Sequence, residues 1–458
     1  MVATELPTAN TTTRSSSSKL PPSEKDASFE KPIDSPVVLV EEVKGRGTVE
    51  VEMEVDVEDC PDGGLKAWLV VVGAVCGMCA TIGLINAWGT FQAYYQQVEL
   101  RQQSSSDIAW IGSIQNAMRY TAGLLTGRLF DMGHLRLPVF IASALFVACM
   151  FLTAECTQYW QFLLCQGFGI GLTSGVFFTM TNMVMTHWFK KRLGLAYAFM
   201  YAGAGIGGCI FPVIFKALLQ RMSFPWTMRI LAFITLGLLA VTNLTITRRL
   251  PPKQDRSPLI NLAEFKNPTY SLYVLSLFIN ALALFTALTY LTISAAKAGI
   301  DANMSFALLS IANAASTLGR IAAGLLADLY GPLTVLMSAA LMSAVMTYAW
   351  PFAKDVAGFA VIAALVGMST GAIIATLVYP FTRMGPVSDV GVRIGMGLTV
   401  MSIGILAGPP ISGAIVDATG SFRNVGYYAG SMLALSAVFM FVVRHLTIRM
   451  GTGSRIIA

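Results

Sequence analysis

Charged side chains are scarce in this sequence of 458 residues. Only 12% of the residues are Asp, Glu, Lys or Arg, whereas 55% are hydrophobic. A soluble protein carries roughly a quarter charged residues, so this composition excludes an ordinary soluble domain and favours a membrane protein with several spans. No cluster of His, Asp, Ser or Cys with catalytic spacing occurs either, so we do not expect an enzyme.

Motifs for nucleotide or metal binding are also missing from the sequence. It contains no Gly-x-x-x-x-Gly-Lys-Ser/Thr loop, which argues against transport driven by ATP. Cys76 and Cys79 have the spacing of a metal or redox pair, but no His or second Cys pair accompanies them, so we interpret them as small residues on a membrane helix. We therefore expect no cofactor, no metal, no ATP and no nucleic-acid partner.

The few charges are unevenly distributed. Residues 1–65 contain 14 of the 25 acidic and 6 of the 31 basic residues (net −8), which leaves 11 acidic and 25 basic residues (net +14) for the rest. Because this first segment is rich in Ser, Thr, Pro and Glu, we expect a disordered acidic tail in the cytoplasm. The first apolar run begins near Ala67, so the sequence predicts no cleavable signal peptide.

Long apolar runs occupy the chain after this tail. A run of about 20 residues crosses about 30 Å of hydrocarbon as a helix. The sequence predicts twelve such spans, at residues 67–95, 107–127, 137–155, 160–187, 193–219, 226–247, 268–297, 304–327, 332–352, 356–382, 391–417 and 425–446. The polar connector 248–267 divides them six and six. We therefore predict an all-α membrane protein with helical bundles at 66–247 and 268–448 and a short cytoplasmic tail at 449–458.

Lysine and arginine predict the orientation of these spans, because they collect on the cytoplasmic side of a membrane. With the N-terminus inside, 16 of them lie in inner loops and the C-terminal tail and 7 at the outer ends. Both termini are therefore predicted to be cytoplasmic, at the plasma membrane or, alternatively, at the vacuole or another internal membrane. Asn303, in Asn-Met-Ser, would then lie in a short outer loop where it could accept a glycan.

The two halves of the chain repeat each other. Three segments of the first half recur in the same order in the second: 127–131 at 324–328 (offset 197), 171–175 at 367–371 (offset 196), and 192–207 at 393–408 (offset 201). In the last pair Arg192-Leu-Gly194 corresponds to Arg393-Ile-Gly395. Repeated segments at a nearly constant offset indicate an internal duplication.

The segments after the second and eighth spans resemble the signature loop of the major facilitator superfamily. In each, a glycine (Gly127, Gly324) is followed four residues later by an aspartate (Asp131, Asp328). Glycine lets two helices approach closely, and an aspartate at a helix end can face the N-terminal dipole or an arginine of a neighbouring helix. The resemblance implies a twelve-helix fold in which these four residues latch the two halves in one state.

Two further segments resemble the signatures of the monocarboxylate porter family, especially its fungal members. The first is Pro-Asp-Gly-Gly before the first span, with Asp62, Gly63 and Gly64, although Leu65 stands where the family usually has an aromatic residue. The second segment, 188–208, contains Lys191, Arg192, Gly203 and Gly207. This resemblance covers residues 61–448 and implies a secondary active transporter of small carboxylated metabolites.

Two arginines, Arg119 and Arg320, lie inside the second and eighth apolar spans. Either would cost at least about 2.5 kcal/mol against lipid, so we expect both to face a central cavity. The 11 acidic residues outside the tail all lie at helix ends or in loops, which leaves no carboxylate at mid-membrane depth. An anionic substrate would supply the missing charge, because arginine can bind a carboxylate through two hydrogen bonds. The alternative is that backbone carbonyls, water or an acid at a helix end serve as partners.

The porter resemblance supports Arg320 as a substrate-binding residue, but it leaves open whether transport is coupled to protons. In animal monocarboxylate porters an aspartate that carries the proton precedes this arginine by one turn, and helix 1 contains a lysine. The corresponding positions here are Ser316 and Gly89. Coupling to protons is therefore implied by the family alone.

Other polar residues inside the spans are further candidates for binding substrate. Asparagine and tyrosine can hydrogen-bond to substrate hydroxyl or carbonyl groups. These candidates are Asn86, Asn182, Asn280, Tyr290 and Asn313. Hydrogen bonds between helices, which contribute about 0.6 kcal/mol each, are the alternative for every one of them.

Taken together, these patterns predict a secondary active transporter that moves a small carboxylated or polar organic metabolite by alternating access. Its expected partners are a small anionic substrate, protons and the lipid bilayer. Because the lysine and aspartate of the animal porters are absent, simple uptake of a monocarboxylate is less favoured. Export of a secondary metabolite from a biosynthetic cluster is therefore an alternative. A nutrient sensor that keeps the fold, transports nothing and signals through its acidic tail is an alternative of another class.

Overall fold

The structure is a computed structural model that describes residues 62–250, 261–385 and 387–449, all within one compact unit. The predicted tail up to residue 61, residues 251–260 of the predicted connector and residues 450–458 lie outside the described residues.

Helices make up both halves of the described chain. We call α1–α10 the N-half and α11–α18 the C-half. The N-half contains α1 (Leu65–Met78), α2 (Leu84–Asn86), α3 (Trp88–Tyr94), α4 (Ser105–Thr121), α5 (Gly123–Asp131), α6 (Arg136–Thr153), α7 (Tyr159–Phe162), α8 (Gly171–Trp188), α9 (Leu193–Leu219) and α10 (Phe224–Thr245). The C-half contains α11 (Pro268–Ala281), α12 (Thr286–Lys297), α13 (Ala302–Tyr330), α14 (Pro332–Ala349), α15 (Val356–Thr376), α16 (Tyr379–Arg383), α17 (Val390–Thr419) and α18 (Phe422–Arg449).

The predicted all-α membrane architecture is confirmed. Eleven helical segments of the described chain are long and apolar enough to cross a membrane, and each coincides with one predicted span. The span predicted at 107–127 is instead divided at Ala122 into α4 and α5. This segment is less apolar than the others because α4 carries several polar side chains, among them Gln115, Asn116 and Arg119.

Local sequence sets several helix ends. The side chain of Asn267 accepts a hydrogen bond from the N–H of Thr269 at 3.0 Å, and Pro268 occupies the first turn of α11. Gly331, with φ of 83°, separates α13 from α14, and Gly420, with φ of 65°, ends α17. α13 already begins at Ala302, so Asn303 lies in its first turn and not in a loop as predicted.

The first, fourth, seventh and tenth predicted spans are not continuous α-helices. The first contains a π-helical turn at Cys79–Gly83 and a break at Ala87, and the fourth contains a π-helical stretch at Leu163–Ile170, between α7 and α8. The seventh is interrupted between α11 and α12, and the tenth between α15 and α16. Irregular turns of this kind are common at functional sites, because they free backbone groups and redirect side chains.

Glycines repeat the same helix contacts in the two halves. A Cβ at Gly175 of α8 would overlap the carbonyl oxygen of Arg119, and one at Gly371 of α15 would overlap that of Ser316. The offsets are 371 − 175 = 196 and 316 − 119 = 197. The duplication predicted from the sequence therefore corresponds to equivalent packing of α8 on α4 and of α15 on α13.

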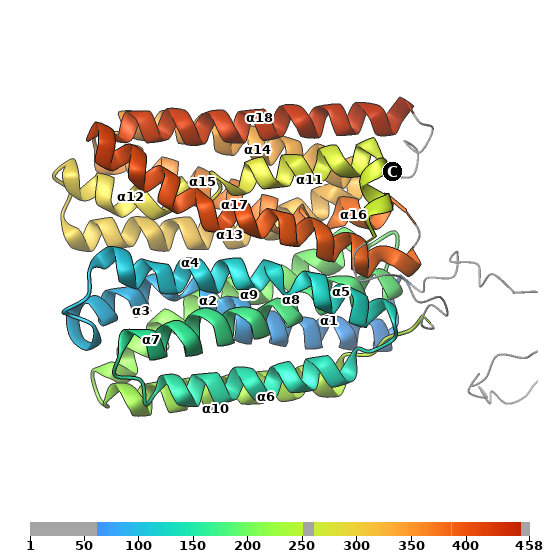
Figure 1. The fold of residues 1–458 in the computed structure, drawn as a ribbon, viewed down its shortest axis with the longest axis horizontal. Helices are drawn as coiled ribbons and strands as arrows, with labels where there is room; N and C mark the ends of the chain where they lie inside the picture. The colour runs from blue at the N-terminus through green and yellow to red at the C-terminus, as the bar shows by residue number, and fades with distance from the viewer. Residues whose placement is uncertain (1–61, 251–260, 386, 450–458) are drawn as a thin grey trace, which may run out of the picture. The chain divides into compact units, whose positions relative to one another are not determined.

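Contacts between the halves follow two pairs of long helices. α9 of the N-half packs along α13 of the C-half, and α17 of the C-half packs along α4 and α5. Figure 1 shows these helices running alongside one another. Large apolar side chains on other helices face outward, such as Leu137 and Leu244, as expected for helices that contact lipid.

Replacing a contact glycine should destabilise the bundle. Gly371→Ala should lower the free energy of unfolding by about 1–3 kcal/mol, because the new Cβ forces α15 away from α13. Gly237→Ala in α10 is the matched control, since no atom of another described helix lies within 4 Å of its Cβ position and alanine favours a helix. The apparent melting temperature of the purified protein in detergent measures both. Equal melting temperatures for the two variants would refute this packing.

Candidate functional site

The first latch loop, residues 127–133, binds the start of α17 in the other half. The carboxylate of Asp131 accepts hydrogen bonds from the N–H groups of Gly391 (3.0 Å) and Val392 (2.8 Å). These groups belong to the first turn of α17, where N–H groups have no partner within the helix and the dipole favours a negative charge. A Cβ at Gly127 would overlap the carbonyl oxygen of Gly391, so glycine lets the carboxylate reach these donors.

The second latch loop, residues 324–331, makes the same contact in the opposite direction. The carboxylate of Asp328 accepts hydrogen bonds from the N–H groups of Gly194 (2.7 Å) and Leu195 (2.8 Å) in the first turn of α9. A Cβ at Gly324 would overlap the carbonyl oxygen of Gly194. Each half therefore supplies one aspartate and one helix N-terminus, and the two contacts connect the halves at one end of the bundle, which we call the latch end.

The latch contacts correct the register of one predicted repeat. Gly194 and Gly391 bind equivalent aspartates, and their offset is 391 − 194 = 197, the same as 328 − 131 = 197. The predicted match of Arg192-Leu-Gly194 to Arg393-Ile-Gly395 is therefore wrong by one helical turn. A short motif of Arg, an aliphatic residue and Gly occurs in both halves, but only the contacts define which turn is equivalent.

In the middle of α9 and α17 the glycines repeat with the predicted offset of 201 residues. A Cβ at Gly203 or Gly207 of α9 would overlap a carbonyl oxygen of the first span, from Val75 or Cys79. Gly404 and Gly408 of α17 make the equivalent approach to the seventh span, at the carbonyl oxygens of Phe278 and Leu282. The repeat thus shifts by one turn between the latch end and the middle of these helices.

Asp62 connects the two signature segments. Its Oδ1 accepts hydrogen bonds from the N–H groups of Lys190 (2.7 Å), Lys191 (2.8 Å) and Arg192 (3.2 Å), directly before α9. Three successive N–H groups around one oxygen form an anion-binding nest. Asp62 and Gly64 have φ of 45° and 88°, which turns the chain at this point, and Gly63 lies between them. The signatures at 61–64 and 188–208 therefore meet in space.

Arg119 and Arg320 are both buried, with 3% and 5% of their surface exposed. They lie close enough for their positive charges to repel each other. One guanidinium nitrogen of Arg119 donates a hydrogen bond to the hydroxyl of Tyr120 at 2.6 Å. Nε of Arg119 and both Nε and Nη1 of Arg320 have no hydrogen-bond partner among the described residues. Neither arginine forms an ion pair with a described carboxylate.

Aromatic and amide side chains surround these arginines. The guanidinium carbon of Arg119 lies 4.4 Å from the ring centre of Tyr120 and 5.8 Å from that of Phe178. The hydroxyl of Tyr201 donates to Oδ1 of Asn182 at 2.9 Å and lies within electrostatic range of both arginines. We call Arg119, Arg320, Tyr120, Tyr201 and Asn182 the arginine cluster. Tyr120 and Tyr201 were not predicted, because a tyrosine inside an apolar run gives no signal that separates a site from a core.

The remaining predicted residues lie in other environments. Asn280 is fully buried in α11, next to the break after Ala281, and neither atom of its amide has a hydrogen-bond partner among the described residues. Asn86 donates to the backbone oxygen of Ala204 at 3.2 Å, and Tyr290 donates to that of Pro409 at 3.4 Å, so both connect helices. Asn313 is half-buried in α13.

Comparison with known proteins identifies the family. The model of the Major Facilitator Superfamily matches residues 69–333 and 273–450, which together cover most of the chain. The chain belongs to the Major Facilitator Superfamily, and it is an integral membrane transporter that works by alternating access between its two halves.

Curated relatives cover nearly the same part of the chain. MFS-type transporter 1 of Ophiocordyceps sp. is 36% identical over 85% of this chain and 87% of its own length. The aspyridones efflux protein apdF of Emericella nidulans is 33% identical over 84% of this chain and 79% of its own length. The agnestins efflux protein AgnL12 of Paecilomyces divaricatus is 32% identical over 83% and 87%. These relatives do not place the chain specifically among the monocarboxylate porters.

Solved structures with the same fold are more distant in sequence. The transporter FucP in its outward conformation matches with a TM-score of 0.62 and 17% identity, over 82% of this chain and 98% of its own. The human organic anion transporter MFSD10 matches with a TM-score of 0.67 and 13% identity, over 82% and 100%. At these identities the likeness concerns the fold.

The latch contacts predict the phenotype of two conservative variants. Asp131→Asn and Asp328→Asn should each slow turnover by about 5-fold or more while changing substrate affinity less than 2-fold. An amide offers one acceptor oxygen where the carboxylate binds two N–H groups, and an unmade buried hydrogen bond costs about 1–3 kcal/mol. Flux and equilibrium binding in reconstituted vesicles measure the two effects separately. A loss of affinity at unchanged turnover would contradict a role in the conformational switch.

Proposed function

We propose that this transporter exports a small organic anion, and that Arg320 and Arg119 bind its negative charge. The observation that carries the proposal is the arginine cluster. Two buried guanidinium groups repel each other there, and nitrogen atoms of both lack hydrogen-bond partners among the described residues. A buried charge without a partner is costly, so a bound anion would relieve both the repulsion and the missing hydrogen bonds.

The composition of the cluster favours a substrate with both charge and aromatic or apolar surface. Tyr120, Phe178 and Tyr201 form a chain of ring contacts, with centres 5.3 and 6.1 Å apart. Such rings contact planar or apolar groups, while Arg320 binds oxygen atoms; the amide of Asn182 already donates to the carbonyl of Phe178 and accepts from Tyr201. We therefore expect a carboxylated or acidic phenolic metabolite and not a simple sugar.

The relatives support export over uptake. Several are named as efflux proteins for aspyridones, agnestins or fujikurins. Those names describe those proteins, and this chain shares 32–33% of its residues with them over most of its length. We propose that this chain likewise exports a secondary metabolite.

The residues that handle protons in animal monocarboxylate porters have no counterpart near Arg320. Ser316 lies one turn before it, buried in α13, and the Cβ position of Gly89 contacts Leu309.

We propose that the latch end faces the cytoplasm, as the positive-inside pattern predicts. The described state would then be closed toward the cytoplasm, which in an exporter is the state that releases substrate outside.

Loss of Arg320 should abolish export without loss of the protein. In cells that lack the transporter, the metabolite should accumulate inside and fall in the medium, and expression of the natural chain should reverse both changes. Arg320→Ala should restore less than about 3% of this export, because removing one partner of a buried charge pair costs about 2–5 kcal/mol. Metabolite profiles of cells and medium, with membrane levels of each variant, measure the effect.

The control for this experiment is Arg449→Ala, which removes an exposed arginine at the end of α18. It should restore export fully. Normal export by Arg320→Ala would remove this arginine from the substrate site. Metabolite binding by the natural chain without flux in vesicles would instead support the sensor alternative.

Proton coupling can be tested on the same metabolite. If export uses the proton gradient, collapsing the pH gradient across reconstituted vesicles with an ionophore should abolish accumulation against a concentration gradient. Equilibration down a gradient should continue. Unchanged accumulation would show that protons do not drive this transporter.

A further inference from the structure

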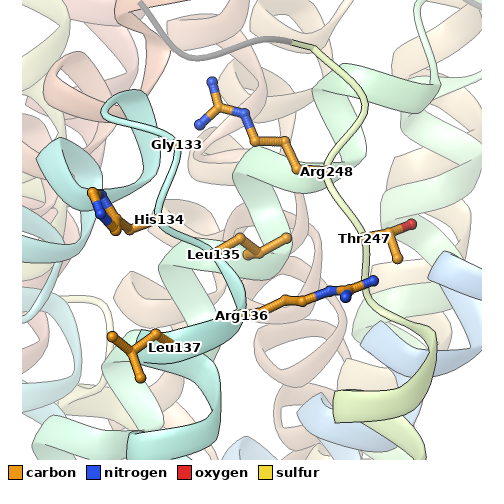
Figure 2. Close-up of a pocket in the computed structure, with 7 residues that line it drawn as sticks. All are labelled: Gly133, His134, Leu135, Arg136, Leu137, Thr247 and Arg248. Atoms are coloured by element: carbon orange, nitrogen blue, oxygen red, sulfur yellow. The ribbon is translucent and has the colours of Figure 1, made fainter. Parts of the chain in front are cut away.

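A pocket of about 370 Å³ lies beside the first latch loop, away from the arginine cluster. Its lining comes from the connection between α5 and α6 and from the segment after α10, namely Gly133, His134, Leu135, Arg136, Leu137, Thr247 and Arg248. Figure 2 shows the side chain of Arg136 extending from the start of α6 toward Thr247, and that of Arg248 extending toward Gly133. None of the described lining residues is acidic.

Two features make the pocket suited to an anion. Arg136 is exposed at the first position of α6, and no described side chain caps this helix, so a positive side chain and N–H groups that have no partner within the helix occupy the same turn. Arg248 is held in place, because its Nε donates to the carbonyl of Leu250 at 2.7 Å and its guanidinium lies 5.1 Å from the ring centre of Phe130. The pocket is therefore cationic and partly preorganised.

The carboxylate of the adjoining latch loop, Asp131, already has hydrogen-bond partners. Asp131 lies within electrostatic range of Arg248, but its oxygens accept the hydrogen bonds from Gly391 and Val392. The guanidinium of Arg248 also donates to the carbonyl of Phe130, the residue before Asp131. The pocket thus borders the latch without taking part in its hydrogen bonds to α17.

Apolar side chains continue from the pocket along the outer face of the bundle. Leu137, which lines the pocket, is 61% exposed, and Phe140, one turn further along α6, is 63% exposed. Leu244, at the end of α10, is 82% exposed, and α6 and α10 pack against each other. A ligand here would meet positive charge at one end and a lipid-facing apolar surface at the other.

We propose that this pocket binds the phosphate-bearing headgroup of an anionic phospholipid, whose acyl chains lie along α6 and α10. Its volume is at the lower end of the range of about 300–1,000 Å³ for small-molecule sites, which suits a headgroup. Basic pockets at the membrane surface attract anionic lipids, mostly on the cytoplasmic side. A soluble phosphate would use the arginines but leave the apolar rim of Leu137 without a function.

Lipid binding to the purified full-length protein in detergent tests this proposal. Native mass spectrometry can compare phosphatidic acid with phosphatidylcholine of the same acyl chains. Phosphatidic acid should bind more tightly to one site. Arg136→Gln and Arg248→Gln should each weaken that binding about fivefold, the contribution expected of one arginine near an anionic lipid. Arg449→Gln, an exposed arginine at the end of α18, should leave it unchanged.

The results that overturn the proposal are specific. Equal binding of phosphatidic acid by Arg136→Gln and by Arg449→Gln would exclude the pocket, and this comparison does not depend on Arg248, which also has structural contacts. Equal affinity for phosphatidylcholine would exclude recognition of an anionic headgroup. Displacement of phosphatidic acid by inorganic phosphate at the same concentration would assign the site to a soluble anion instead of a lipid.

Discussion

Two buried positive charges that have no carboxylate partner among the described residues constrain the interior of this transporter. Arg119 and Arg320 come from opposite halves, from α4 and α13, and their charges repel each other across the junction. The surrounding side chains only partly compensate this repulsion, through the hydroxyl of Tyr120 and the faces of two rings. In the proposed function an anionic substrate supplies charge of the opposite sign, and both halves bind it at once.

The symmetric and asymmetric parts of the structure have different functions in this account. The latch contacts and the glycine contacts repeat between the halves with offsets of 196–203. The arginines do not repeat, since Arg320 corresponds to Gly123 and Arg119 to Ser316 at the offset of 197. Gly123 lies close to the other half, because a Cβ there would be 3.3 Å from Cα of Gly395 in α17. Repeated contacts suit a motion common to both halves, whereas the unrepeated charges suit recognition of a particular substrate.

The sequence was sufficient to predict the architecture and the latch aspartates, because both rest on local patterns. Apolar runs of the required length predict spans, and a glycine four residues before an aspartate recurs in both halves. It did not predict that Asp62 binds the N–H groups of residues 190–192, since these are about 130 residues apart in the chain. The roles of Tyr120 and Tyr201 and the break at Ala122 also depend on packing between helices, which periodicity alone does not encode.

A double-mutant cycle on the substrate tests the central claim most directly. Once the metabolite is identified, its affinity and that of its uncharged methyl ester can be measured by calorimetry with the natural chain and with Arg320→Ala. If the arginines bind the substrate's charge, esterification should weaken binding much more in the natural chain than in Arg320→Ala, in which only Arg119 remains. If esterification reduces affinity by the same factor in the natural chain and in Arg320→Ala, the arginine does not bind the substrate's charge.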